Sequence, residues 1–108
     1  MAHEYQLKYL PLFYDDLSQV VTYISEKLHN PKAARDLLDE TEKVIRERLP
    51  VAESFEPYHS VNDRKYPYYR IYVGNYVVYY VVCADASGNR TMEIRRFLYG
   101  GSDREKMI

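Results

Sequence analysis

Two β-rich runs joined by a two-residue turn constrain this chain more than any other feature. Residues 68–73 and 76–84 are rich in Tyr, Val and Ile, and only Gly74-Asn75 separates them. A two-residue loop whose residues tolerate positive φ predicts a β-hairpin with a fixed register. In that register Arg70 lies opposite Tyr79. The sequence therefore predicts an antiparallel sheet built around this hairpin.

Two helical patterns precede the hairpin. The first begins at Pro11, and its apolar residues return every three or four positions. The second begins at Asn30-Pro31, which is typical of an N-cap followed by proline at the first helical position, and it ends at Pro50. The expected core combines the two helical stripes with one face of the β-hairpin, and its members are Leu17, Val20, Ile24, Leu37, Leu38, Ile71, Val78 and Tyr80.

The order of these elements predicts an α+β domain. Alternating apolar and polar residues over 5–10 indicate a first strand, and a last strand is expected over about residues 91–99. Residues 50–67 have no period and predict a loop that is long for a compact domain. A length of 108 residues allows one domain, 1–108, of order βααβββ. In that domain a helical hairpin packs on one face of a four-stranded, mainly antiparallel sheet.

Tyrosine and charge are unevenly distributed along the chain. There are 13 Tyr but 3 Phe and no Trp, and eight of the 13 lie between Tyr58 and Tyr80. Residues 1–56 carry a net charge of −4 and residues 57–108 carry +3. The second face of the sheet is expected to be open, and its residues are Arg70, Tyr72, Val77, Tyr79 and Val81. Cations beside flat rings bind phosphates and bases, so this face is a candidate nucleic-acid surface, with an ordinary solvated sheet surface as the alternative.

The residue content gives no support to metal, cofactor or membrane functions. Cys83 is the single cysteine, so no internal disulfide or zinc framework is expected. The three histidines, His3, His29 and His59, are scattered and predict neither a metal site nor a catalytic relay. No apolar run approaches the roughly 20 residues of a membrane span, and no signal-peptide pattern opens the sequence. We therefore expect a cytoplasmic protein without a cofactor.

Three segments taken together resemble the RelE/ParE toxin family. The segments are Tyr9-Leu10-Pro11-Leu12 with Asp15-Asp16-Leu17, the hairpin over residues 69–80, and Arg95-Arg96-Phe97-Leu98-Tyr99-Gly100 with Asp103. The similarity covers nearly the whole chain and includes the βααβββ order. The resemblance implies the toxin of a type II toxin–antitoxin system, such as those associated with plasmid stabilization, held inactive by a cognate antitoxin.

The resemblance leaves more than one activity open. RelE-like members are ribosome-dependent mRNA endoribonucleases, also called mRNA interferases, and they cleave RNA without a metal. ParE-like members bind DNA gyrase and are not enzymes, and a degenerate toxin would bind only its antitoxin. The resemblance favours the mRNA interferase, although Val77 occupies a position where RelE-like members carry Arg.

The resemblance also assigns site residues for RNA cleavage. Arg70 matches the basic residue that opens the second strand, and Arg96 and Tyr99 are the counterparts near the end of the last strand. The arginines would stabilise the charge of the phosphorane, and Tyr99 could protonate the leaving 5′-oxygen. These three are the expected catalytic residues. The expected RNA contacts are Arg64, Lys65, Tyr72, Tyr79 and Arg104.

Overall fold

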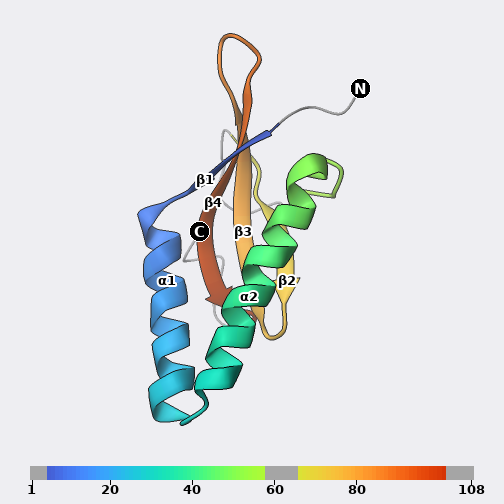
Figure 1. The fold of residues 1–108 in the computed structure, drawn as a ribbon. Coiled ribbons are helices and arrows are strands. Elements are labelled where there is room, and N and C mark those ends of the chain that lie inside the picture. The colour runs from blue at the N-terminus through green and yellow to red at the C-terminus, as the bar shows by residue number, and fades with distance from the viewer. Residues whose placement is uncertain (1–4, 58–65, 102–108) are drawn as a thin grey trace.

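Four strands form one mixed sheet, and two helices pack on it (Figure 1). The computed structural model describes residues 5–57 and 66–101. The bounds of the strands are Tyr5–Tyr9 for β1, Tyr69–Val73 for β2, Tyr76–Ala84 for β3 and Arg90–Tyr99 for β4. Their order across the sheet is β1-β4-β3-β2, with β1 parallel to β4 and both other pairs antiparallel. The predicted α+β class and the order βααβββ are confirmed.

The hairpin of β2 and β3 has the predicted register. Arg70 pairs with Tyr79, and the two-residue turn begins at Gly74 with a φ of +56°. A positive φ at the first central position is characteristic of a type II′ turn, whose twist matches that of the flanking strands. The backbone N–H of Gly100 donates to the carbonyl oxygen of Asn75 at 2.7 Å. This bond ties the end of β4 to the turn.

The helices begin where the sequence predicts. α1 (Pro11–Thr22) and α2 (Pro31–Arg48) each have proline in the first turn, and the side chain of Asn30 accepts a backbone hydrogen bond as the N-cap of α2. α1 continues into a π-helical turn (Tyr23–Lys27), and α2 continues into a 3-10 turn (Leu49–Val51). Among the described residues, no helix is both long enough and apolar enough to cross a membrane.

The two helices diverge from a shared end, so that α1 follows β4 while α2 crosses toward β2 (Figure 1). The main core lies between these helices and one face of the sheet. α1 contributes Phe13 and α2 contributes Ile45, both almost fully buried. The sheet contributes Tyr69, Ile71, Val73, Val78, Tyr80, Val82, Met92, Ile94 and Phe97.

The helical stripes are less buried than the sequence predicts. Leu38 is exposed to 38%, so its assignment to the core is wrong. Four other stripe residues are only partly buried, namely Leu17, Val20, Ile24 and Leu37. The sheet residues of the predicted core, Ile71, Val78 and Tyr80, are buried as expected. The helices contact each other at their shared end and diverge from it, so their apolar stripes are only partly covered.

The second face of the sheet is covered rather than open at its centre. Val77, Tyr79 and Val81 are each exposed to 1% or less, and they cluster with Tyr68 and Leu98. The ring of Tyr68, just before β2, stands edge-on to that of Tyr79, with 6.0 Å between the ring centroids. The expectation of an open platform at these positions is therefore wrong. Hydrophobic alternation identified this face of the sheet, but it could not show that Tyr68 would pack on Tyr79.

Arg48 fastens the end of α2 to the sheet. Its Nη1 donates to the backbone oxygen of Arg70 at 3.2 Å and to the hydroxyl of Tyr80 at 3.0 Å. The Tyr80 hydroxyl in turn donates to the oxygen of Ala52 at 2.7 Å. The Arg48 guanidinium also lies 3.5 Å from the centroid of the Phe55 ring. Burial raises the pKa of Tyr80, so this hydroxyl remains a donor at neutral pH.

The unequal burial of two isoleucines predicts unequal costs for their truncation. Ile45 is 1% exposed, whereas Ile24 is only partly buried. We expect Ile45→Ala to lower the free energy of unfolding by about 3 kcal/mol and Ile24→Ala by roughly half as much. Urea denaturation of the two variants measures both values. Equal losses would contradict the partial burial of Ile24.

Candidate functional site

Arg70 and Arg96 lie in one row across the sheet. Tyr79 of β3 pairs with Arg70 of β2 on one side and with Arg96 of β4 on the other. Adjacent strands are about 4.8 Å apart, so the two arginine Cα atoms are about 10 Å from each other. Residues paired across strands point to the same face. The cross-strand row, Arg70–Tyr79–Arg96, therefore places two of the expected catalytic residues on one face of the sheet.

A bulge shapes the β4 end of this row. Tyr79 pairs with Arg96, whereas the next residue, Tyr80, pairs with Ile94. Arg95 is the extra residue, and a bulge of this kind re-aims the side chains beside it. Sequence alternation alone could not locate this shift, because the Arg95-Arg96 pair fits either face.

Arg96 is held by Asp16 of α1. Its Nε donates to Oδ2 at 2.7 Å and its Nη2 donates to Oδ1 at 2.9 Å, while the backbone N–H of Phe97 donates to Oδ2 at 3.0 Å. The hydrogen bonds to Asp16 raise the pKa of Arg96. β1 ends at Tyr9, opposite Ile94, so the remainder of β4 lacks a strand on that side. Asp16 caps this edge and fixes the guanidinium at the same time.

The other arginines of this region also have partners. Arg95 donates from Nε to Oε1 of Glu93 at 2.9 Å, and its guanidinium lies 5.9 Å from the centroid of the Tyr68 ring. The guanidinium of Arg70 lies 5.9 Å from the Tyr72 ring centroid, at cation–π distance. The carboxylates of Asp16 and Glu93 therefore offset much of the positive charge of this face.

The expected tyrosines do not converge on the row. Tyr79 lies in the row but is fully buried, while Tyr72 is 62% exposed. Tyr99 follows the strand alternation to the opposite face, where its ring contacts that of Tyr76 with 5.9 Å between centroids. Tyr72 and Tyr99 meet only at the end of the sheet, where both line a shallow hollow of about 370 Å³.

Three other expected RNA contacts, Arg64, Lys65 and Arg104, lie outside the described residues, and their roles stay predictions.

Cleavage of RNA by its own 2′-OH requires a base, a stabiliser of the phosphorane and an acid. Within the described part of the row, Arg70 and Arg96 are suited to stabilise charge, but no exposed group is suited to act as a base. Within residues 5–57 and 66–101 no cluster of His, Cys, Asp and Glu could hold a metal ion.

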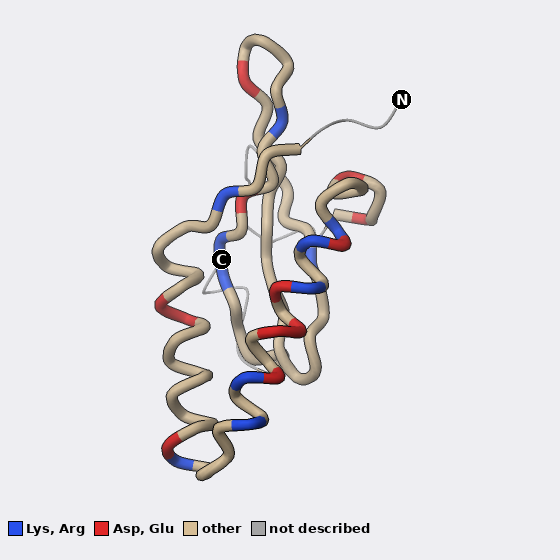
Figure 2. Tube along the Cα trace, viewed as in Figure 1, with Lys and Arg blue, Asp and Glu red and all other residues tan. Residues whose placement is uncertain are grey.

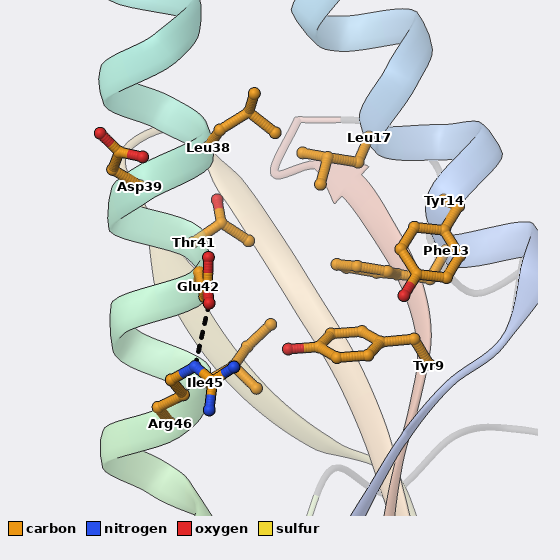
Figure 3. Close-up of a pocket in the computed structure, with 10 residues that line it drawn as sticks. All are labelled: Tyr9, Phe13, Tyr14, Leu17, Leu38, Asp39, Thr41, Glu42, Ile45 and Arg46. Atoms are coloured by element: carbon orange, nitrogen blue, oxygen red, sulfur yellow. Dashed lines mark hydrogen bonds and ion pairs between the residues drawn. The ribbon is translucent and has the colours of Figure 1, made fainter.

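The structure has a groove between α1 and α2 that the sequence did not predict. It has a volume of about 430 Å³. The residues that line this inter-helix groove are Tyr9, Phe13, Tyr14, Leu17, Leu38, Asp39, Thr41, Glu42, Ile45 and Arg46. Leu17 and Leu38 face each other across it, and the hydroxyl of Tyr9 points across it toward α2 (Figure 3). Such a size and such a lining are typical of binding sites.

The two walls of the inter-helix groove differ in chemistry. The α1 side is aromatic, and the rings of Tyr9, Phe13 and Tyr14 lie 5.5 to 5.9 Å from one another. The α2 side carries charge at its rim, where Glu42 Oε1 and Arg46 Nε form an exposed ion pair at 3.0 Å. Figure 2 shows charges of both signs along α2, whereas α1 has only two acidic residues and no basic one. The groove therefore suits an amphipathic segment better than a strongly charged one.

The partners of the two arginines predict different effects on stability. Arg96→Ala leaves the carboxylate of Asp16, 10% exposed, without its guanidinium, and we expect it to lower the free energy of unfolding by about 3 kcal/mol. Arg70→Ala removes a half-buried surface cation and should cost less than about 1 kcal/mol. Urea denaturation at pH 7 compares the two. A loss below about 1 kcal/mol for both variants would contradict the anchoring role of Arg96.

Comparisons with known proteins do not add to this description. The sequence matches no protein-family model, and a search of curated proteins finds no significant relative. The resemblance to the RelE/ParE family therefore remains a hypothesis.

Proposed function

We propose that this chain is the toxin of a type II toxin–antitoxin pair, of the RelE/ParE type, and that it acts in the cytoplasm. The single observation that carries the proposal is the inter-helix groove, a hollow of about 430 Å³ with an aromatic wall, left open by the divergence of α1 and α2. A small domain with such an unfilled groove is suited to bind a protein segment. The cognate antitoxin is the partner that the resemblance implies.

The antitoxin segment that fits this groove is an amphipathic helix. Helix-in-groove binding uses apolar side chains at i and i+4, or i and i+3, and the volume of the groove accommodates two or three of them. Leu17 and Leu38 would contact these side chains at the centre. At the rim, Asp39 favours a Lys or Arg on the flank of the helix, whereas Glu42 is already paired with Arg46.

The described geometry favours a toxin that inhibits by binding over one that cleaves RNA. The guanidinium of Arg96 is occupied by Asp16, Tyr79 is buried, and Tyr99 lies on the other face of the sheet. A nuclease that used these three groups would need them together and accessible. DNA gyrase is the target that the resemblance implies for a non-enzymatic toxin.

Ribosome-dependent mRNA cleavage is the second candidate, and one observation favours it. Arg70 and Arg96 occupy the same cross-strand row, as a pair of cations on either side of a scissile phosphate would. In this case Arg70 is the accessible cation, and the acid and base would come from groups outside the row. The two candidates differ in a direct observable, the integrity of mRNA in cells that make the toxin.

Binding in the inter-helix groove predicts that a charge at Leu38 disrupts the complex. The chain is co-expressed with the product of any short reading frame that adjoins its gene, and the complex is purified through a tag on the chain. Leu38→Glu should weaken binding at least about tenfold, because the complex would bury an unpaired carboxylate. The matched control is Leu28→Glu, at an exposed leucine beyond the groove, and it should bind like the wild type. Equal binding by both variants would place the partner elsewhere, and absence of any complex with the wild type would remove the toxin–antitoxin proposal.

Inhibition by binding predicts intact transcripts in cells that express the wild-type chain alone. Primer extension should show no new 5′ ends within codons, and purified protein should inhibit supercoiling by DNA gyrase. Arg70→Ala should leave that inhibition within about twofold, because Arg70 has no catalytic role in this mechanism. The opposite result, new 5′ ends that depend on translation and disappear in Arg70→Ala, would establish the mRNA interferase instead.

A further inference from the structure

The hydroxyl of Tyr9 is a polar group inside the inter-helix groove. Tyr9 is the last residue of β1, and its hydroxyl points across the groove toward α2 (Figure 3). Among the described residues this hydroxyl has no hydrogen-bond partner. Two other tyrosine hydroxyls do have one, since Tyr5 donates to Glu53 and Tyr80 donates to the backbone of Ala52. The Tyr9 hydroxyl is therefore left to bond with whatever enters the groove.

Apolar side chains surround this hydroxyl. The rings of Phe13 and Tyr14 lie 5.5 and 5.6 Å from the Tyr9 ring, measured between centroids. On the facing wall Ile45 is 1% exposed. An occupant that fills this part of the groove excludes water from the hydroxyl. If the occupant offers no hydrogen-bond partner, the lost bond costs roughly tenfold in affinity.

The groove presents a hydrogen-bond donor on one wall and an acceptor at the facing rim. Burial raises the pKa of Tyr9, so the hydroxyl keeps its proton at neutral pH and acts as a donor. Arg46 lowers the same pKa and Glu42 raises it, as expected for a hydroxyl that faces this ion pair. Within the pair, Arg46 donates to Oε1 of Glu42, which leaves Oε2 as an acceptor at the rim.

A carboxamide matches this arrangement of donor and acceptor. Its oxygen accepts from the Tyr9 hydroxyl, and its NH₂ group donates to Glu42. An ammonium or a guanidinium has no acceptor for the proton of the Tyr9 hydroxyl. A carboxylate would accept that proton, but it would lie beside the carboxylate of Glu42. The chemistry of the groove therefore favours an uncharged amide over either charged group.

We propose that Tyr9 determines the specificity of the inter-helix groove by selecting a segment that inserts a glutamine or asparagine carboxamide between the helices. The inference rests on the proposed function in one respect, namely that a helical segment of an antitoxin is the occupant. In such a helix one Gln or Asn would stand among the apolar side chains that contact Leu17 and Leu38. The hydrogen-bonding groups belong to the groove itself, so they can be tested on the chain alone.

Benzamide is the probe for this test, because it joins a carboxamide to a flat apolar ring. It is titrated into the wild type, Tyr9→Phe and Tyr14→Phe, and NMR follows the methyl signals of Leu17 and Leu38. The wild type should bind with a Kd of about 1–10 mM, and Tyr9→Phe at least about fivefold more weakly. Tyr14→Phe is the matched control, since it removes a hydroxyl from a neighbouring ring that is 55% exposed, and it should bind within about twofold of the wild type.

Two further titrations vary the polar group of the probe. Benzoate carries a carboxylate and benzylamine an ammonium in place of the carboxamide, and both should bind the wild type more weakly than benzamide. Three outcomes would overturn the role of Tyr9: no binding of benzamide by the wild type, tighter binding of either charged probe, or an equal loss in the two Phe variants.

Folding and partner binding are checked separately. Tyr9→Phe should melt within about 2 °C of the wild type, because its hydroxyl bonds to no described residue, and a larger drop would contradict the assignment. In co-purification with the product of an adjoining reading frame, Tyr9→Phe should weaken the complex as Leu38→Glu does. A loss with Leu38→Glu alone would keep the antitoxin in the groove and overturn the role of Tyr9. Absence of any complex would remove the toxin–antitoxin proposal, whereas the benzamide titration would still decide the role of Tyr9.

Discussion

The contact between Asp16 and the unpaired edge of β4 determines where α1 lies on the sheet. β1 pairs with only the first part of β4, so beyond Ile94 the strand has no neighbour on that side. One carboxylate satisfies the backbone at Phe97, neutralises Arg96 and fixes where α1 lies against the sheet. An unsatisfied backbone N–H and an unpaired, partly buried guanidinium would both be costly, so the position of α1 follows from this edge.

The position of α1 in turn determines the inter-helix groove. α1 is drawn to the β4 edge by Asp16, while α2 is fastened toward β2 by Arg48, which reaches the backbone of Arg70 and the hydroxyl of Tyr80. Two helices fixed at opposite sides of a four-stranded sheet cannot pack against each other along their whole length. The groove thus results from two arginine contacts that hold the helices apart. The apolar side chains that line it are those that the helices would bury if they packed against each other.

Sequence patterns predicted the elements well because their signals are local. The Gly74-Asn75 turn fixed the pairing of Arg70 with Tyr79, and the Asn30-Pro31 start of α2 has the expected cap. Patterns could not predict how far apart the helices lie, since periodicity identifies a face but not its partner. They also could not show that Asp16 would meet Arg96, 80 residues away, or that Tyr68 would cover Tyr79. Tyr99 was placed with the arginines by its position in a motif, whereas the alternation of β4 sends its ring to the opposite face.

The parallel pairing of β1 with β4 has a consequence for the order in which the chain can fold during synthesis. Tyr5 pairs with Arg90, so β1 must wait until β4 has been synthesised before it gains a hydrogen bond in this sheet. Contacts between such distant residues form late, and a strand without its partner is a site for misassociation. The helical hairpin and the β2–β3 hairpin are complete before that moment. Until β4 has been synthesised, a nascent chain would therefore expose the apolar side of its helices that faces the sheet. A partner that binds at this stage would contact a surface that the folded domain buries.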